Sequence, residues 1–347
     1  MKLKKEYLSI VYLYEKFLSE SEKGRRLQKN GAVIGASTIC QYKALLTNLK
    51  AFEMTSKRQW LFTTQYKHSK TAFNKEKKHY KSFYLNFTNF LYAKGCIDNY
   101  VGHQIKHIKT LFNYLIHSKG YEMGIFYKEF YARKEEIPVI VLNQEQLRFL
   151  IKDKAFENSL PDNLKISKDI FVVGCSTGLR YSDLINLQQR NIETFNGNTY
   201  IINKSIKTNT FTRIKLPEYV LDILKKYNSK QKKLLPVRSL DNFNHNVKKM
   251  AELAGWTEEI GKIRSNRGKR KDKKTLDGRV YRFCDHISSH VMRKTAITTL
   301  LILGIPEALV RKISGHAPNS KEFYKYVKYT DSFLDCETDK AFGKLIN

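Results

Sequence analysis

Apolar residues recur every three or four positions through most of this 347-residue chain, and this spacing restricts it to a largely helical fold. The clearest examples are segments 42–52, 83–91 and 105–115. Lysine and histidine occupy the opposite faces of these segments. Ser37 and Thr38 are the expected caps of the first helix, and Gly95 is the expected stop of the second. We therefore predict a small basic helical domain over residues 1–130.

One stretch departs from helical spacing. Residues 198–217, NTYIINKSIKTNTFTRIKLP, alternate between apolar and polar and are rich in β-branched side chains, which predicts a β-hairpin with a turn near Asn209. A helix that contains residues 170–173 and ends at the turn 176–178 precedes it, and helical spacing returns afterwards. The predicted fold class is mainly α with a small β-sheet (α+β).

Two segments interrupt these elements. Residues 131–143 turn from charged to apolar around Pro138, which breaks a continuing helix, so we interpret them as a linker between the first domain and a second one over residues 144–347. The charge run Lys262–Lys274, KIRSNRGKRKDKK, is expected to form an exposed loop.

The charge balance indicates a polyanionic partner. Lysine and arginine number 63 against 33 aspartate and glutamate, a net charge of +30. This excess favours nucleic acid, with a basic ribosomal or membrane-surface protein as the alternative. Because 41% of the residues are hydrophobic and 12% aromatic, the chain is expected to fold.

The cysteines and the hydropathy pattern point to a cytoplasmic protein. Five cysteines are scattered without a C-x-x-C pair, as expected of reduced core thiols and not of a disulfide frame or a zinc site. The N-terminus lacks the apolar core of a signal peptide, and no run approaches the roughly 18 apolar residues of a membrane span.

Two arginines and two histidines are suited to phosphate chemistry. Arg180 follows a glycine turn at a helix start, where its guanidinium can grip two phosphate oxygens, and Asp183 is expected to orient it. His290 and Arg293, at i and i+3, lie on one helix face, and a further turn and helix lead to Gly315-His316.

A metal site is the alternative interpretation of the histidines. His286, His290 and His316 are potential ligands, but no acidic ligand accompanies them at metal-binding spacing.

In chain order, TGLRYSDL, Lys-Thr within the hairpin, His-x-x-Arg, Gly-His and a tyrosine about ten residues later resemble the tyrosine recombinase (phage integrase) family. The resemblance covers Val141 to about Lys340 and extends more loosely to residues 1–130, which are similar to the family's helical core-binding (SAM-like) domain. The segment SGHAPNSKEFYKYVKYT is most similar to integrases of conjugative and mobilisable transposons.

The resemblance implies roles for the phosphate-binding residues. Arg180 and Arg293 would clamp the scissile phosphate and stabilise its transition state. His290 and His316 would add hydrogen bonds, with His290 also a candidate proton acceptor. Lys207 would be the general acid for the leaving oxygen, with Lys204 as the alternative.

The resemblance also implies a tyrosine nucleophile. Most family members place it nine residues after the histidine, where this chain has Lys325. Alignment with the F-x-K-Y-I pattern of transposon integrases selects Tyr326 instead, ten residues after His316. Tyr324 is the competing candidate. With Tyr326 as the nucleophile, Tyr324 and Tyr329 are both expected to be packing residues.

As a family member, the chain would cut and rejoin double-stranded DNA through a phosphotyrosyl intermediate, without metal, ATP or other cofactor. Its two domains would form a C-shaped clamp. Its tail would be a short helix that links four protomers, with a helix that packs only within its own protomer as the alternative; the apolar residues of this tail are Phe333, Leu334, Ala341, Phe342 and Leu345. No arm-site module is expected, and host DNA-bending or directionality factors are possible partners. The competing functions are a DNA-binding relative without catalysis, a type IB topoisomerase and a metal-dependent nuclease.

Overall fold

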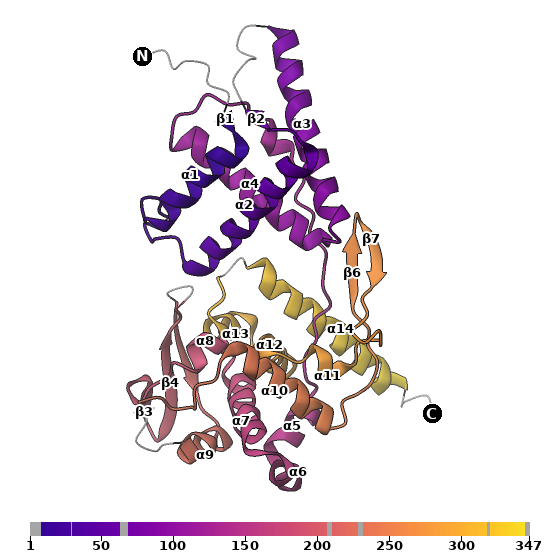
Figure 1. Ribbon diagram of the computed structural model, residues 1–347. Helices are drawn as coiled ribbons and strands as arrows, with labels where there is room; N and C mark the ends of the chain where they lie inside the picture. The colour runs from indigo at the N-terminus through magenta and orange to yellow at the C-terminus, as the bar shows by residue number, and fades with distance from the viewer. Residues whose placement is uncertain are drawn as a thin grey trace. The chain divides into compact units, whose positions relative to one another are not determined.

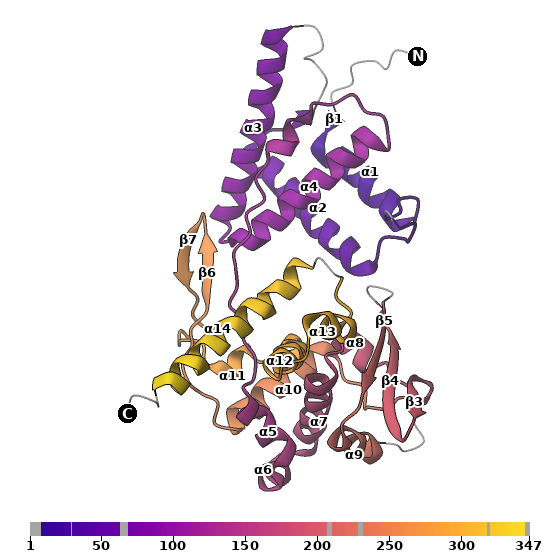
Figure 2. The same ribbon diagram turned by 180° about the vertical axis from the view of Figure 1, so that it is seen from behind.

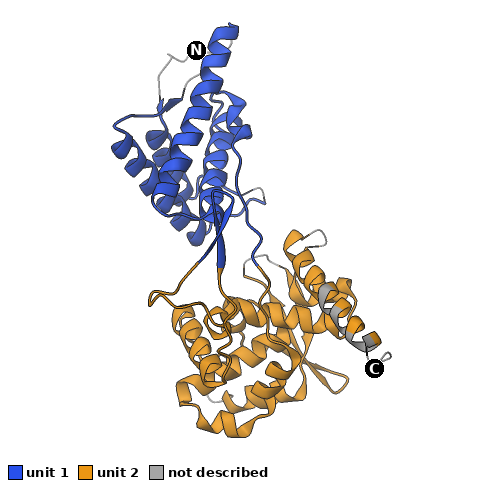
Figure 3. Ribbon diagram, turned by 90° about the vertical axis from the view of Figure 1, so that its right-hand side faces the viewer, with its two compact units in different colours: residues 1–137, 263–272 blue, residues 138–262, 273–347 orange. Residues whose placement is uncertain are grey.

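The computed structural model describes residues 8–28, 30–62, 69–206, 210–227, 232–317 and 320–343. The chain divides into two compact units, which Figure 3 colours separately. Unit 1 comprises residues 1–137 and 263–272, and unit 2 comprises residues 138–262 and 273–347. The predicted α+β class is confirmed, since helices dominate both units and the sheets are small.

Unit 1 is built on helices with an aromatic core. The helices are α1 (Ile10–Glu22), α2 (Ala36–Ser56), α3 (Lys70–Ala93) and α4 (Asp98–His117), followed by a 3₁₀ turn at Ile125–Glu129. Short strands β1 (Leu8–Ser9) and β2 (Leu61–Phe62) pair antiparallel. Phe83, Phe87 and Phe112 are fully buried among these helices, as the spacing predicts.

The predicted helix ends are partly correct. Gly95 follows the end of α3 with φ 79°, a conformation that glycine adopts readily, so this stop is confirmed. The predicted caps of α2 are wrong. That helix begins at Ala36 with Gly35 as its N-cap, and Ser37 and Thr38 lie inside its first turn.

The charge run expected to be a loop is instead a β-hairpin. Strand β6 (Ile263–Asn266) pairs with β7 (Lys269–Asp272), with Asn266 opposite Lys269. Its turn residues Arg267 and Gly268 have φ 52° and 79°, the left-handed pair of a type I′ turn. The clustered like charges masked this turn signal in the sequence.

Unit 2 surrounds a buried helix, α7 (Asp162–Thr177), which packs against α10 (Leu240–Leu253) and α12 (Ser289–Ile302) near the centre of the unit in Figures 1 and 2. Residues 170–173 of α7 have no exposed surface. The surrounding helices are α5 (Gln144–Lys152), α6 (Lys154–Ser159), α8 (Tyr181–Leu184), α9 (Glu218–Tyr227), α11 (Phe283–His286), α13 (Glu307–Ser314) and α14 (Lys321–Gly343).

The predicted hairpin of unit 2 is confirmed and gains a strand. β4 (Asn198–Lys204) pairs antiparallel with β5 (Phe211–Lys215), and β3 (Ile192–Phe195) adds to the other edge of β4. The expected turn residue Asn209 lies outside the described residues.

The C-terminal segment forms a single helix that is longer than expected. α14 contains Tyr326 and continues to Gly343, whereas a short helix was expected after the tyrosine. The side chains of Phe333 and Ala341, and all of Leu345, lie outside the described part of the chain. No helix within the described residues is long and apolar enough to cross a bilayer.

Gly174 leaves room for the Met292 side chain where α7 meets α12. A Cβ there would lie 2.3 Å from Sδ of Met292. Alanine in a helix is favoured over glycine by roughly 0.5–1 kcal/mol, but overpacking costs about 1–3 kcal/mol, so we predict that Gly174→Ala lowers the free energy of unfolding of unit 2. In a Met292→Ala background the same change is expected to be neutral or stabilising. Urea denaturation of wild type, the two single variants and the double variant tests this. An equal loss of unfolding free energy in both backgrounds would show that Met292 is not the residue that an added Cβ meets.

Candidate active site

Arg293 lies at the centre of a cluster of polar side chains in unit 2. It is 8% exposed, and it donates from Nη1 to the carbonyl of Gly178 at 2.7 Å and from Nη2 to the carbonyl of Ser314. These carbonyls belong to the C-terminal ends of α7 and α13, where helix carbonyls lack partners within the helix and the helix dipole is negative. The two helix ends therefore hold the buried cation in place.

Two glycines produce this arrangement. Gly178 and Gly315 end α7 and α13 in the left-handed conformation, with φ 66° and 62°. A Cβ on Gly315 would also lie 3.3 Å from Thr212 of β5. Burial, and then the charge of Arg180, lower the pKa of Arg293 to about 10, so the guanidinium stays charged at neutral pH.

Arg180 occupies the N-cap position of α8, as predicted, but Asp183 orients it indirectly. Nη1 of Arg180 donates to Oγ of Ser205 at 3.0 Å, and this hydroxyl donates to Oδ2 of Asp183, also at 3.0 Å. Oδ1 of Asp183 accepts from the backbone N–H of Ile206 at 3.0 Å. The buried carboxylate thus fixes both Arg180 and the hairpin segment that leads to residue 207.

His316 follows Gly315, the C-cap of α13, and contacts Arg293. Its Nδ1 lies 2.8 Å from Oγ of Ser314 and 3.4 Å from Nη2 of Arg293. Burial, followed by the charges of Arg293, Arg180 and Arg311, lowers the pKa of His316 to about 4. The imidazole is therefore neutral at physiological pH and can hydrogen-bond without adding charge.

Tyr326 faces this histidine from α14. The two ring centroids are 6.1 Å apart, and the ring of Phe323, also on α14, is 5.5 Å from the His316 ring. Burial raises the pKa of Tyr326, and Arg293 opposes that rise through its charge, as does Arg180. Tyr326 is thus grouped with the two arginines and the histidine.

Tyr324 and Tyr329 have other surroundings. The expectation that Tyr324 is a packing residue is wrong, because Tyr324 is 54% exposed and has the Arg311 guanidinium 4.9 Å from its ring centroid. Tyr329 is partly buried, and burial raises its pKa.

The remaining predicted site residues are a histidine on α12 and the two candidate lysines of the hairpin. His290 lies on α12 one turn before Arg293 and is exposed. Lys207 lies outside the described residues. The alternative, Lys204, is exposed on β4, with its ammonium 6.0 Å from the Phe211 ring centroid.

The alternative of a histidine metal site has no geometric support. Among the described residues, no three histidine, cysteine, aspartate or glutamate side chains are grouped as metal ligands. His286 instead places Nε2 2.8 Å from the carbonyl of Gly261.

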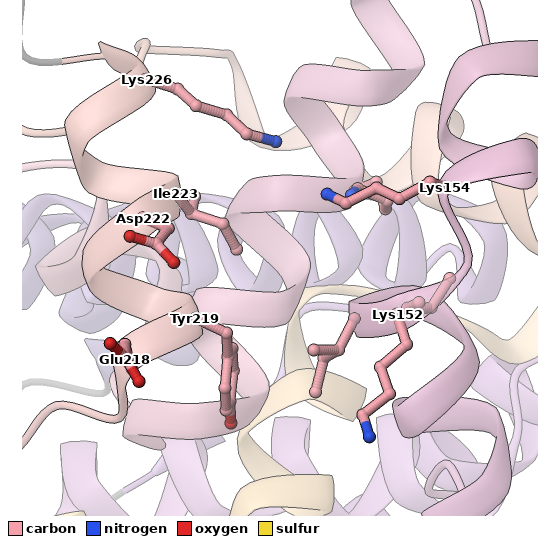
Figure 4. Close-up of a pocket in the computed structure, with 10 residues that line it drawn as sticks. Lys152, Lys154, Glu218, Tyr219, Asp222, Ile223 and Lys226 are labelled. Atoms are coloured by element: carbon pink, nitrogen blue, oxygen red, sulfur yellow. The ribbon is translucent and has the colours of Figure 1, made fainter.

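A separate hollow of about 600 Å³ lies beside α5 and α9. Figure 4 shows Tyr219, Asp222 and Ile223 of α9 on one side of it and Lys152 and Lys154 on the other. The five candidates that the structure describes do not line it. The hollow is therefore not part of the arginine–histidine–tyrosine cluster.

Ser205 and Ser314 also belong to the site, although neither was predicted from the sequence. Ser205 joins Asp183 to Arg180 across 22 residues of sequence separation, and Ser314 supplies both a carbonyl to Arg293 and a hydroxyl to His316. Local spacing gives no signal for the first contact. The position of Ser314 directly before Gly-His was visible in the sequence and could have indicated the second.

Comparison with known proteins gives a family match. The model of the phage integrase family matches residues 141–332. No curated protein matches the chain significantly by sequence.

Several solved recombinase structures have a similar fold. XerH site-specific recombinase bound to difH substrate is 14% identical, with a TM-score of 0.59, over 94% of this chain and 97% of XerH. The Tn1549 transposon integrase, in complex with circular intermediate DNA, is 15% identical, with a TM-score of 0.56, over 92% and 95% of the two chains. A lambda integrase tetramer bound to a Holliday junction is 12% identical, with a TM-score of 0.57, over 90% of this chain and 79% of the lambda integrase chain.

The lowered pKa of His316 predicts a pH dependence of stability. The pKa is about 4 in the folded chain, against about 6.5 for an unperturbed histidine, so between these values the unfolded state binds more protons. The contribution to stability is full above pH 6.5 and is lost as the pH falls towards 4. We expect His316→Gln to weaken the fall in unfolding free energy between pH 7 and pH 5, measured by urea denaturation. An identical pH dependence in both proteins would show that His316 titrates normally.

Proposed function

The chain belongs to the phage integrase family and is a site-specific tyrosine recombinase, and we propose that it cuts DNA by forming a 3′-phosphotyrosyl bond at Tyr326. The observation that carries this assignment is the grouping of Tyr326 with His316 and Arg293 in unit 2. Arg180, Lys207 and His290 complete the proposed active site.

The proposed cleavage step is a transesterification. Oη of Tyr326 attacks the scissile phosphorus, the bond to the 5′-oxygen breaks, and Lys207 donates a proton to that oxygen. Arg293 and Arg180 neutralise the charge that develops on the nonbridging oxygens, and His316 donates or accepts hydrogen bonds as a neutral ring. Each arginine is already held by carbonyls or by Ser205, so little reorganisation accompanies the reaction.

Tyr326 must lose its proton during the attack. Burial raises its pKa, so the free hydroxyl is a weak nucleophile. The two nearby guanidinium groups favour the phenolate as it forms, and His290, exposed one turn from Arg293, is the proposed proton acceptor. Attack by a new 5′-hydroxyl on the phosphotyrosine then reseals the strand and exchanges partners through a Holliday junction.

No step of this mechanism consumes energy or uses a metal. The phosphotyrosyl bond keeps the energy of the phosphodiester, so ATP is not required. This distinguishes the proposed reaction from that of a metal-dependent nuclease, whose activity is lost in EDTA.

The proposed partners are double-stranded DNA and further copies of this chain. The net charge of +30 suits a duplex, and XerH and the Tn1549 integrase were solved with DNA. Because lambda integrase forms a tetramer on a Holliday junction, we propose the same assembly here, with the end of α14 as the linking element. Unit 1 would be the core-binding half, and the protein would associate with the nucleoid and with host bending or directionality factors.

The first test concerns the nucleophile. A nicked suicide substrate that carries the target site should trap wild type and Tyr324→Phe as covalent DNA adducts in EDTA, but not Tyr326→Phe, which lacks the attacking oxygen. Gel electrophoresis detects the adduct, and mass spectrometry of the DNA-linked peptide locates it. An adduct retained by Tyr326→Phe, or a peptide linked at Tyr324, would overturn the assignment.

The second test concerns the general acid. We expect Lys207→Ala to slow cleavage by about 10²- to 10⁴-fold, the usual contribution of a proton donor. A substrate with sulfur in place of the scissile 5′-oxygen leaves as a thiolate, which needs no proton, and should restore cleavage by this variant. Lys204→Ala is the matched control and should cleave the oxygen substrate nearly as fast as wild type. Rescue of Lys204→Ala instead would transfer the role to Lys204.

A further inference from the structure

One strand of the β6–β7 hairpin, β7, is strongly basic. Lys269, Arg270 and Lys271 are consecutive in β7 and exposed, and no ion pair joins any of them to a carboxylate among the described residues. Three adjacent unpaired cations repel one another, so an isolated hairpin of this composition would be poorly stable. Something outside the hairpin must hold it in place.

The first anchor is Asp98, at the start of α4. Its carboxylate is 3% exposed and accepts from the backbone N–H groups of Arg267 and Gly268, each at 2.8 Å, and from the Tyr92 hydroxyl at 2.7 Å. The two turn residues have consecutive left-handed conformations, which direct neighbouring N–H groups towards a single anion. Asp98 therefore holds the hairpin by its turn.

The second anchor is Glu135, on the segment that follows the 3₁₀ turn. Its carboxylate accepts from the backbone N–H of Ser265 and lies 3.8 Å from Nε of Arg264. Nearby, Nδ2 of Asn266 donates to the carbonyl of Cys96 at 3.0 Å. All of these contacts are made by residues of β6 and of the turn. The side chains of Lys269, Arg270 and Lys271 in β7 take no part in them. Figure 3 shows the hairpin in the colour of unit 1, to which all these partners belong.

We propose that this hairpin is a phosphate-contacting arm of unit 1, in which Asp98 and Glu135 hold a basic strand against the nucleic-acid backbone. The proposal rests on the proposed function, since it assumes that the chain binds duplex DNA. Three positive charges without acidic partners favour binding to a polyanion. Contacts to phosphates do not depend on the base sequence. Two buried carboxylates thus serve DNA binding although their own charge opposes it.

The triple variant Lys269→Gln/Arg270→Gln/Lys271→Gln tests the contact. For wild type, the logarithm of the duplex affinity should fall linearly with the logarithm of salt concentration. Each lost phosphate contact lowers that slope by about 0.9, so the variant should show a slope reduced by up to about 2.7. An unchanged slope would overturn the proposal and leave the strand for another partner, such as an acidic protein surface. If wild type shows no salt-dependent duplex binding, the proposed function itself fails.

Asp98→Asn tests the anchor, because it makes the chain more positive. Charge alone predicts tighter binding, whereas release of the hairpin predicts weaker binding. We expect Asp98→Asn to bind duplex more weakly than wild type. Asp162→Asn, at a side chain that is 95% exposed, makes the same charge change and should not weaken binding. Equal or tighter binding by Asp98→Asn would show that the anchor does not matter.

Combining the changes separates release of the hairpin from unfolding of unit 1. If Asp98 acts through the basic strand, Asp98→Asn should add little to the loss of the triple variant. Amide hydrogen exchange should be faster in residues 264–270 of Asp98→Asn and unchanged in α1–α3. Additive losses of affinity, or faster exchange throughout unit 1, would contradict the proposal that Asp98 acts by holding the basic strand.

Discussion

The candidate active site depends on one buried guanidinium. Arg293 is removed from water and surrounded by the carbonyl ends of α7 and α13, so its position is fixed by where those two helices stop. A buried arginine without such acceptors would be strongly destabilising. The folding of unit 2 therefore already places the cation that we propose binds the scissile phosphate. His316 and Tyr326 are positioned from the same point, the first by the turn after α13 and the second by α14.

The sequence predicted those parts of the site that local geometry determines. His290 and Arg293 share a helix face because their spacing is i, i+3, and the glycines before Arg180 and His316 end helices as expected. The bridge from Asp183 through Ser205 to Arg180 could not be predicted, because it depends on how the hairpin packs on α8. The β6–β7 hairpin was missed for a related reason. Besides the turn signal that its like charges masked, the hairpin is held by carboxylates far away in the chain, Asp98 and Glu135.

The choice between the two tyrosines depends on the phase of a helix. Counting from His316 leaves Tyr324 and Tyr326 as near alternatives. Within α14, however, Phe323, Tyr326 and Thr330 lie three and four positions apart, so they share a face, and Phe323 and Thr330 are buried. Tyr324 falls outside that face and is largely exposed. The helix face therefore favours Tyr326 over Tyr324, whereas the number of residues after His316 does not distinguish them.

Unit 1 is discontinuous in the chain, and this affects the order in which a newly made protein can fold. The residues that bind Asp98 are made about 170 positions after it, as the separations of 169 and 170 residues for its two turn contacts show. While the ribosome is still producing unit 2, the helices of unit 1 can gather, but the Asp98 carboxylate must remain hydrated. The N-terminal unit therefore completes its folding only after most of the C-terminal unit has been synthesised.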